Sequence, residues 1–268
     1  VELGITQSDR IVDPLHLDDH QADQGNGDGG DGGDGGDIEI PVRPPNVIVN
    51  TIEGDQGDNN LLGTEVGDDL LGFAGDDTVT GLESDDNLYG GNGEDLIFGR
   101  EGDDNAYGGD LNDVIFGGIS GEFFGDEGDD DFIDGGNGSD VIFGNIGQDT
   151  ILGGNGADQI FGGQGDDLIG GDDGDDFLTG DLGDDTLVGG SGRDRFLLVE
   201  GAGTDLIADF ETEDRFVLGG DLTFEQLTIN AVAGLTQISV TATSEVLVTL
   251  PGVAVSAIDE SDFTLFDA

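Results

Sequence analysis

A nine-residue pattern of glycine, acidic and apolar positions runs from Gly54 to Leu197. Each unit has the form Gly-x-x-Gly-x-Asp-x-apolar-x, and sixteen consecutive units can be counted. Glycine occupies the first position of every unit, and an apolar residue occupies the eighth. A fixed period of this kind predicts a solenoid, because a unit with one apolar residue can bury it only by stacking on neighbouring units.

The order of positions within a unit predicts a tight turn followed by a short strand. Glycine at positions one and four lets the backbone take φ > 0 in the turn. Side chains at positions seven to nine alternate between the two faces of a strand, so the eighth points inward. The turn is too short for a helix, and we therefore expect a parallel solenoid. A flexible Gly/Asp linker would have no reason to place an apolar residue at the same position of every unit.

Two adjacent units differ in length from the others. The unit at Gly117 has eight residues and the unit at Gly125 has ten, with Phe124 and Phe132 as their eighth positions. Together they restore a span of eighteen residues between Gly117 and Gly135. This predicts that two units make one coil, with two strands per coil.

The units resemble the RTX, or hemolysin-type calcium-binding, nonapeptide Gly-Gly-x-Gly-x-Asp-x-(large apolar)-x. The best matches are residues 153–161 and 135–143, with 162–170 close behind, and the resemblance covers more than half of the chain. It implies an all-β fold: a right-handed parallel β-roll with two strands per 18-residue coil. It also implies calcium ions in the turns along both edges of the roll and export by bacterial type I secretion.

The resemblance further implies which residues bind calcium. The side-chain ligands would be the position-six aspartates Asp68, Asp77, Asp86, Asp95, Asp104, Asp113, Asp130, Asp140, Asp149, Asp158, Asp167, Asp176, Asp185 and Asp194. Backbone ligands would come from positions one and three, as at Gly153, Asn155, Gly162, Gln164, Gly171 and Asp173. Some turns depart from the pattern, with Val66, Ser84 and Leu111 at position four and Asn59 and Glu122 at position six. We expect weak or missing calcium sites there.

Oxygen chemistry supports calcium independently of the resemblance. Calcium takes six to eight oxygen ligands in a flexible shell, whereas transition metals favour histidine or cysteine, which the repeats lack. If each ion bridges units two apart, sixteen units give about 14 calcium sites. His16 and His20 have the i, i+4 spacing of a zinc pair, but two ligands do not make a zinc site.

The net charge of −56 comes from 62 acidic residues and six arginines, with no lysine. Repulsion should keep the bare chain expanded, and bound calcium would offset part of the charge. Nucleic acid and anionic lipid are therefore not expected as partners, and no apolar run is long enough for a membrane span. Extracellular calcium modules bind at ~10⁻⁴–10⁻³ M, so we expect the chain to fold outside the cell.

We expect three regions along the chain. Residues 1–53 form an acidic N-terminal extension with a Gly/Asp-rich linker, 54–197 form the calcium-binding roll, and 198–268 form a β-rich C-terminal cap and secretion region. Thr223 and Gln226 suit a capping box for one short helix. The tail at 262–266 resembles a type I secretion address, and it also suits a last strand of the cap.

Ninth positions should point outward, where they form apolar and aromatic stripes. On one sheet we expect Leu62, Thr80, Phe98, Phe116, Ile133, Leu152, Gly170 and Val188. On the other we expect Leu71, Tyr89, Tyr107, Phe143, Phe161, Thr179 and Leu197. Stripes of this size usually mark an interface. A partner or the protein's own terminal segments could cover them.

The sequence suggests three candidate functions. The first is a secreted structural protein that self-associates into a surface layer, matrix or filament, with cell-surface polysaccharide as a further candidate partner. The second is the calcium-folding export region of a longer toxin or hydrolase. The third, an enzyme, has least support, because the sequence has no His-Glu-x-x-His, no Gly-x-Ser-x-Gly and no cysteine nucleophile. We expect an extracellular protein without enzymatic activity.

Overall fold

The computed structural model describes residues 50–118 and 130–266. These residues form strands and three short 3₁₀ helices: η1 (Phe224–Gln226), η2 (Val255–Ala257) and η3 (Glu260–Asp262). No helix among them is long and apolar enough to cross a membrane. His16, His20, Glu122 and Phe124 lie outside the described residues, so the expectations for them are not tested.

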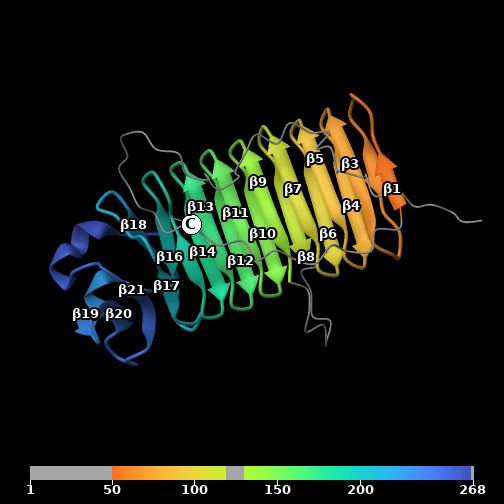
Figure 1. Cartoon of the computed structure of the whole chain (residues 1–268). Helices are drawn as coiled ribbons and strands as arrows, with labels where there is room; N and C mark the ends of the chain where they lie inside the picture. Colours follow the sequence, from red (N-terminus) through yellow and green to blue (C-terminus); the bar gives the residue numbers. More distant parts are fainter. Residues whose placement is uncertain (1–49, 119–129, 267–268) are drawn as a thin grey trace, which may run out of the picture. The chain divides into compact units, whose positions relative to one another are not determined.

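The strands make two sheets, and the chain alternates between them through the repeats (Figure 1). Sheet A has 12 strands in the order β1 (Asn50–Glu53), β3 (Asp68–Ala74), β5 (Asn87–Asn92), β7 (Asn105–Asp110), β9 (Phe132–Asn137), β11 (Thr150–Asn155), β13 (Leu168–Asp173), β15 (Thr186–Val188), β17 (Asp205–Ile207), β21 (Val246–Leu250), β20 (Leu235–Val240) and β19 (Leu227–Val232). Sheet B has 10 strands in the order β2 (Asn60–Leu62), β4 (Thr78–Glu83), β6 (Leu96–Glu101), β8 (Val114–Gly118), β10 (Val141–Ile146), β12 (Gln159–Gln164), β14 (Phe177–Leu182), β16 (Arg195–Leu198), β18 (Arg215–Leu218) and β22 (Phe263–Leu265).

Neighbouring strands of the repeats are parallel and stand one coil apart. Ile142 pairs with Ile160, and Ile160 pairs with Leu178, a spacing of eighteen residues at each step. The prediction of an all-β parallel roll with two strands per coil is confirmed.

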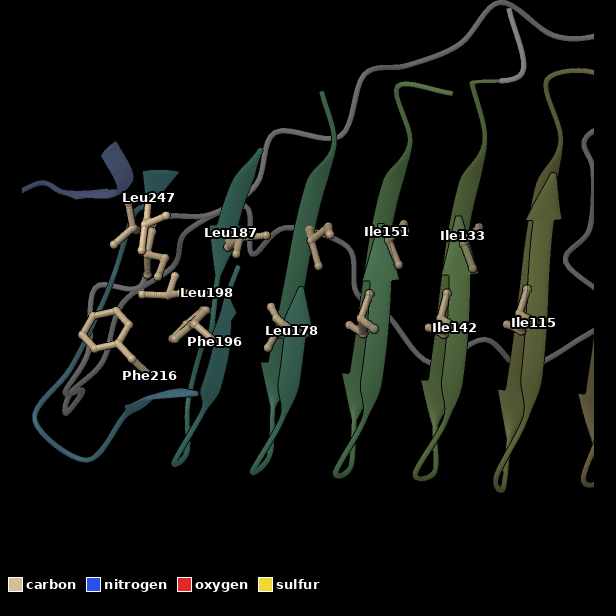
Figure 2. Close-up of a cluster of buried hydrophobic side chains, with 14 of the residues drawn as sticks. Ile115, Ile133, Ile142, Ile151, Leu178, Leu187, Phe196, Leu198, Phe216 and Leu247 are labelled. Atoms are coloured by element: carbon tan, nitrogen blue, oxygen red, sulfur yellow. The ribbon is translucent and has the colours of Figure 1, made fainter. Parts of the chain in front are cut away.

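The core lies between the two sheets and is built from the eighth positions. Ile142, Ile151, Ile160 and Ile169 have no exposed surface. Figure 2 shows Ile115, Ile133, Ile142 and Ile151 directed into the space between the ribbons. One inward side chain per strand thus stacks into two continuous apolar rows, as the unit pattern predicts.

Strands β9 and β10 pair with β7 and β8 in a register that differs from the expected one. Ala106 pairs with Ile133, and Ile115 pairs with Ile142, so the spacing is 27 residues instead of eighteen. Nine additional residues therefore lie between these strands. Phe132 is only half-buried, so its prediction as a core residue was wrong. Most of the residues that define the lengths of the units at Gly117 and Gly125 lie outside those described. Ile133 is buried, because pairing with β7 and β11 on both sides sets the strand register.

Glycine is needed in the turns for two different reasons. Left-handed φ occurs at positions two and four, as at Gly154 (φ 99°) and Gly156 (φ 150°). Position-one glycines such as Gly153 do not have left-handed φ. An added Cβ at Gly153 would lie 2.6 Å from Asp158 Oδ2 and 2.8 Å from the Gly171 carbonyl oxygen. The expectation of φ > 0 at position one was wrong, because the requirement there is steric.

The parallel ladders continue past residue 197. Leu187 pairs with Ile207 and Phe196 pairs with Phe216, so this coil has a 20-residue offset. Strand β21 then follows β17 and begins an antiparallel meander with β20 and β19. Strand β22 pairs with β18, so the tail does form a last strand. The expected short helix is η1, whose preceding Thr223 N–H donates to Gln226 Oε1 at 2.7 Å.

Candidate metal sites along the roll

A row of aspartates is buried at the point where each turn enters its strand. Their side chains occupy position six, and exposures are between 0% and 3% for the buried carboxylates from Asp68 to Asp194. Carboxylates are rarely buried unless a partner compensates the lost hydration. The position-six residues are Asp68, Asp77, Asp86, Asp95, Asp104, Asp113, Asp131, Asp140, Asp149, Asp158, Asp167, Asp176, Asp185 and Asp194.

One oxygen of each carboxylate is used to join successive coils. The backbone N–H of Asp140 donates to Asp158 Oδ1 at 2.7 Å, and the N–H of Asp158 donates to Asp176 Oδ1 at 2.8 Å. The same bond recurs along both edges of the roll, since Asp77 N–H donates to Asp95 Oδ1 at 2.7 Å. Each Oδ1 therefore has a fixed position and its own donor.

The second oxygen is buried and, in most of these residues, accepts no hydrogen bond. The structure shows such an Oδ2 atom in Asp77, Asp86, Asp95, Asp113, Asp140, Asp158, Asp167, Asp176, Asp185 and Asp194. A buried carboxylate oxygen without a donor is costly in a protein interior. The recurrence of this arrangement indicates that something other than a protein group satisfies the Oδ2 atoms.

In eight of these residues a backbone carbonyl oxygen lies beside the Oδ2 atom: Asp77, Asp86, Asp95, Asp113, Asp140, Asp158, Asp167 and Asp176. The space next to the Gly81 Cα contains both Asp86 Oδ2 and the Gly99 carbonyl oxygen, at 2.4 and 2.9 Å from a Cβ built there. The corresponding oxygens beside Gly153 belong to Asp158 and Gly171. Two oxygens from adjacent coils thus converge without a proton donor between them. Such an oxygen-only corner suits a hard cation.

The expected backbone ligands fall into two groups. The carbonyls of Gly153, Gly162 and Gly171 lie next to the glycine one coil earlier, in the oxygen-only corners. The position-three carbonyls bond between coils instead: Asn155 O accepts Gly138 N–H at 2.8 Å, Gln164 O accepts Gly147 N–H at 2.9 Å, and Asp173 O accepts Gly156 N–H at 2.7 Å. The first group therefore lies nearest to the Oδ2 atoms.

Burial strongly changes the acidity of these carboxyl groups. Desolvation, followed by repulsion from neighbouring carboxylates, raises the pKa of Asp113 and Asp176 to about 8. The same causes raise the pKa of Asp140, Asp167 and Asp194 to about 7. Without a cation, burial in the roll therefore disfavours the charged form of these carboxyl groups.

Asp130 does not lie where the sequence placed it. Asp131 is the buried residue, and it accepts the N–H of Asp104 at Oδ1, 2.8 Å away. Asp130 stands at position five, where its Oδ1 accepts the N–H of Gln148 at 2.7 Å. The error arose from counting forward from Gly125, whereas counting backward from Gly135 gives Asp131. The other thirteen aspartates lie at the expected place.

Position-five side chains form a second ladder of hydrogen bonds, which the unit pattern did not predict. Asp76 Oδ1 accepts the N–H of Glu94, and Asp166 Oδ1 accepts the N–H of Asp184, at 3.1 and 2.9 Å. These bonds run in the opposite direction to the position-six bonds, because here the donor belongs to the later coil. The frequent Asp-Asp pairs, such as Asp166-Asp167, were the available signal.

The coil at 205–218 contains two further buried aspartates of the row. Asp205 Oδ1 accepts the N–H of Asp185 at 3.3 Å, and Asp214 Oδ1 accepts the N–H of Asp194 at 3.0 Å. Gly203-Thr204-Asp205-Leu206-Ile207 keeps positions four, six and eight of the unit, which could have revealed Asp205. The longer 20-residue offset concealed it.

The donor set fits calcium better than other metals. In the described parts of the chain no three His, Cys, Asp or Glu side chains come together as a metal-binding group. A cation in these corners would therefore depend on carboxylate and carbonyl oxygens from adjacent coils. Calcium accepts such mixed oxygen shells, while the absence of histidine and cysteine in the repeats disfavours zinc.

An aromatic row occupies the outward face of sheet B. Phe98, Phe116, Phe143 and Phe161 are half-buried and stack in sequence, with ring centroids 5.2, 5.0 and 4.8 Å apart and nearly parallel planes. The expected stripes had assigned Phe143 and Phe161 to the other sheet. That assignment was wrong, because the additional residues before β9 change which later units belong to each sheet.

Comparisons with known proteins agree with the repeats. The family model described as RTX calcium-binding nonapeptide repeat (4 copies) matches residues 71–106, 124–160, 134–169, 161–196 and 170–207. The comparison with curated proteins gives no match.

Two solved structures are similar to part of this chain. The extracellular lipase LipA from Serratia marcescens is 18% identical with a TM-score of 0.29, and the match covers 65% of this chain and 40% of the lipase. The AlgE6R3 subunit from the Azotobacter vinelandii mannuronan C5-epimerase is 22% identical with a TM-score of 0.20, over 58% of this chain and 78% of that one. The chain thus spans less than half of the lipase. The repeated unit, the parallel roll and the family match together identify RTX calcium-binding nonapeptide repeats in this chain, over residues 71–106 and 124–207.

Proposed function

We propose that the protein is a secreted calcium-binding structural protein whose roll folds when it meets calcium outside the cell. The observation that supports this proposal is the buried Oδ2 atom beside a carbonyl oxygen, which recurs along the roll, as at Asp86, Asp158 and Asp176. Calcium supplies the positive charge that these oxygens lack. In this proposal the position-six aspartates and the carbonyls of positions one and three are the ligands, with Asp131 in place of Asp130.

The buried carboxylates at position six make folding depend on a cation. Closing the turns removes the position-six carboxylates from water and places them near one another, which opposes their ionisation. With about 14 ions bound, about 28 positive charges would offset half of the −56. A cation that binds only the closed turns shifts the equilibrium toward the roll.

The same dependence supports folding after export. Extracellular calcium modules typically bind at ~10⁻⁴–10⁻³ M, well above the calcium concentrations of the cytosol. The chain would stay expanded inside the cell and fold outside it. We keep residues 1–53, 54–197 and 198–268 as the proposed regions, with the last combining cap and secretion address.

The aromatic row on sheet B supports self-association into a surface layer, matrix or filament. Because Phe116 and Phe143 stack with an interplanar angle of 7°, the rings cover each other's faces and expose their edges. Exposed edges suit packing against another apolar surface, which a second copy can provide. Sugar binding usually uses an aromatic face, so polysaccharide is the less favoured partner. We propose no catalytic role.

The alternative is that the chain is the calcium-folding export region of a longer protein. The last strand, β22, favours neither role, because it completes sheet B in both cases. An intact mass measured from the native source separates them. A mass near 27.5 kDa supports the structural protein, and a much larger mass supports the carrier.

The calcium proposal is tested with the full chain in millimolar calcium and after chelation. We expect circular dichroism to show strand structure only with calcium, and chelation to abolish it. Light scattering over a concentration series then tests assembly, which should require calcium as well. An identical strand spectrum in both conditions would overturn calcium-coupled folding, and a calcium-bound monomer at all concentrations would overturn self-assembly.

A further inference from the structure

The first coil of the roll closes its turns differently from the interior coils. Asp68 Oδ2 accepts the Thr64 backbone N–H at 2.6 Å and the Thr64 hydroxyl at 2.8 Å. Asp68 Oδ1 accepts Asn50 Nδ2 at 2.6 Å. Both oxygens of this buried carboxylate therefore have protein donors, whereas Oδ2 of Asp77, one unit later, accepts no hydrogen bond.

The other turn of the first coil has the same closure. Asn59 stands at position six, and its Oδ1 accepts the N–H of Asp55 at 2.6 Å. In both turns the N–H of position two points at the position-six oxygen. An N–H donor at this place fills the corner with positive hydrogen and disfavours a cation there.

The backbone of the first coil differs as well. From Phe73 (φ 76°) and Gly75 (φ 106°) onward, positions two and four of the turns take left-handed φ. The residues at the same positions of the first coil do not take left-handed φ. They are Asp55, Gly57, Thr64 and Val66. In the second of these turns the local sequence explains the difference, because the β-branched Thr64 and Val66 disfavour left-handed φ.

We propose that residues 54–71 form a metal-independent cap and that calcium binding begins at the turn of Asp77. The inference rests on the proposed calcium function and removes Asp68 from the ligands. The cap uses Asn50 and Thr64 where interior turns would use a cation. A related closure occurs in the last coil, where Asp214 Oδ2 accepts the N–H of Glu211 at 2.7 Å.

The test compares Asp68→Asn with Asp158→Asn in the full chain. Bound calcium per chain is measured by equilibrium dialysis and atomic absorption. We expect Asp158→Asn to bind less calcium than the parent, and Asp68→Asn to bind the parent's amount. Equal losses in both variants would overturn the cap but leave calcium binding by the repeats intact. A parent that binds no calcium would overturn the proposed function and the cap with it.

Two further variants test the cap even if the Asp68→Asn chain does not fold. Thr64→Val removes one hydroxyl donor and should lower the thermal midpoint in saturating calcium without changing the calcium content. Thr64→Gly with Val66→Gly restores the glycines of the interior turns and should add about one ion per chain, the contribution of one more repeat contact. A reduced calcium content in Thr64→Val, or an unchanged one in the double variant, would contradict the cap.

Discussion

Asp140 and Asp158 stand at the same position of turns one coil apart, and the backbone N–H of the first donates to Oδ1 of the second at 2.7 Å. This bond fixes one carboxylate oxygen and directs the other toward Gly153 and the Gly171 carbonyl. The aspartate thus has a structural role through Oδ1 and a cation-binding role through Oδ2. Calcium content and folding stability report on these two roles separately.

Replacing Asp158 by Asn should remove calcium, because the amide carries no charge and cannot present two carboxylate oxygens. The exposed Asp166, at position five of the next turn, is the matched control, since its Oδ1 also accepts a backbone N–H, at 2.9 Å. We expect Asp166→Asn to keep the parent's calcium content in equilibrium dialysis. Equal calcium loss in the two variants would count against position six as the ligand position.

The revised register predicts different behaviour for two adjacent residues. Asp131 is buried at position six, and Asp130 lies at position five. Asp131→Asn should lower both calcium content and thermal midpoint, while Asp130→Asn should change calcium content little. A calcium titration followed by circular dichroism checks this pair. The opposite ranking would restore the register counted forward from Gly125.

The calcium-free chain should be more stable at acid than at alkaline pH. Burial raises the pKa of Asp140 to about 7 and of Asp176 to about 8, while an unfolded Asp has a pKa near 3.9. Between these values the folded chain binds more protons than the unfolded chain, so the free energy of unfolding falls as pH rises.

Thermal unfolding of the calcium-depleted protein at pH 5 and pH 8 measures this dependence. We expect residual cooperative unfolding at pH 5 and little or none at pH 8. In saturating calcium the pH 8 sample should be the more stable, because the cation requires ionised carboxylates. A calcium-depleted roll that is more stable at pH 8 would contradict the burial of these groups.

Position-one glycine should not tolerate a side chain. Gly153→Ala places a Cβ 2.6 Å from Asp158 Oδ2 and 2.8 Å from a backbone oxygen, and we expect a loss of about 1–3 kcal/mol of unfolding free energy. Gly57→Ala is the control, because the nearest atom would be 3.6 Å away and its φ is not left-handed. That variant should be neutral or slightly stabilised in chemical denaturation.

Replacing a leucine that has left-handed φ should stabilise the chain. Leu111 is exposed and has φ of 82°, so Leu111→Gly should relieve strain and gain about 1 kcal/mol. Leu182 is also exposed but lacks left-handed φ, and Leu182→Gly should destabilise the chain slightly. We expect the denaturant midpoint to rise for Leu111→Gly and to fall for Leu182→Gly. A loss in both would show that Leu111 is not strained.

The parallel roll and its core could be predicted from the sequence because each unit repeats the same constraint. An apolar residue at position eight, beside turns too short for a helix, leaves few alternatives, and Ile142, Ile151 and Ile160 are buried as expected. The position-six aspartates follow from the same count. Regular units therefore reveal both the fold and the position of the candidate ligands.

What the sequence could not show depends on pairing between distant strands. Local counting cannot distinguish Asp130 from Asp131, because only the partners Asp104 and Asp149 on the neighbouring coils fix that register. Similarly, the glycine at position one looks like a turn residue until the Oδ2 atom beside it is seen. The Thr64 and Asn50 bonds to Asp68 also join groups that no unit pattern relates.

The 27-residue step between β7 and β9 has a consequence for how such a protein can change its length. Strands alternate between sheets, so inserting or deleting a single strand-forming nonapeptide would transfer every later strand to the opposite sheet. Phe143 and Phe161 share a face with Phe98 and Phe116 because β10 pairs with β8 at a 27-residue offset, one unit more than the usual eighteen. Growth by pairs of units preserves both outer faces, whereas growth by one unit exchanges them unless that unit is excluded from the sheets.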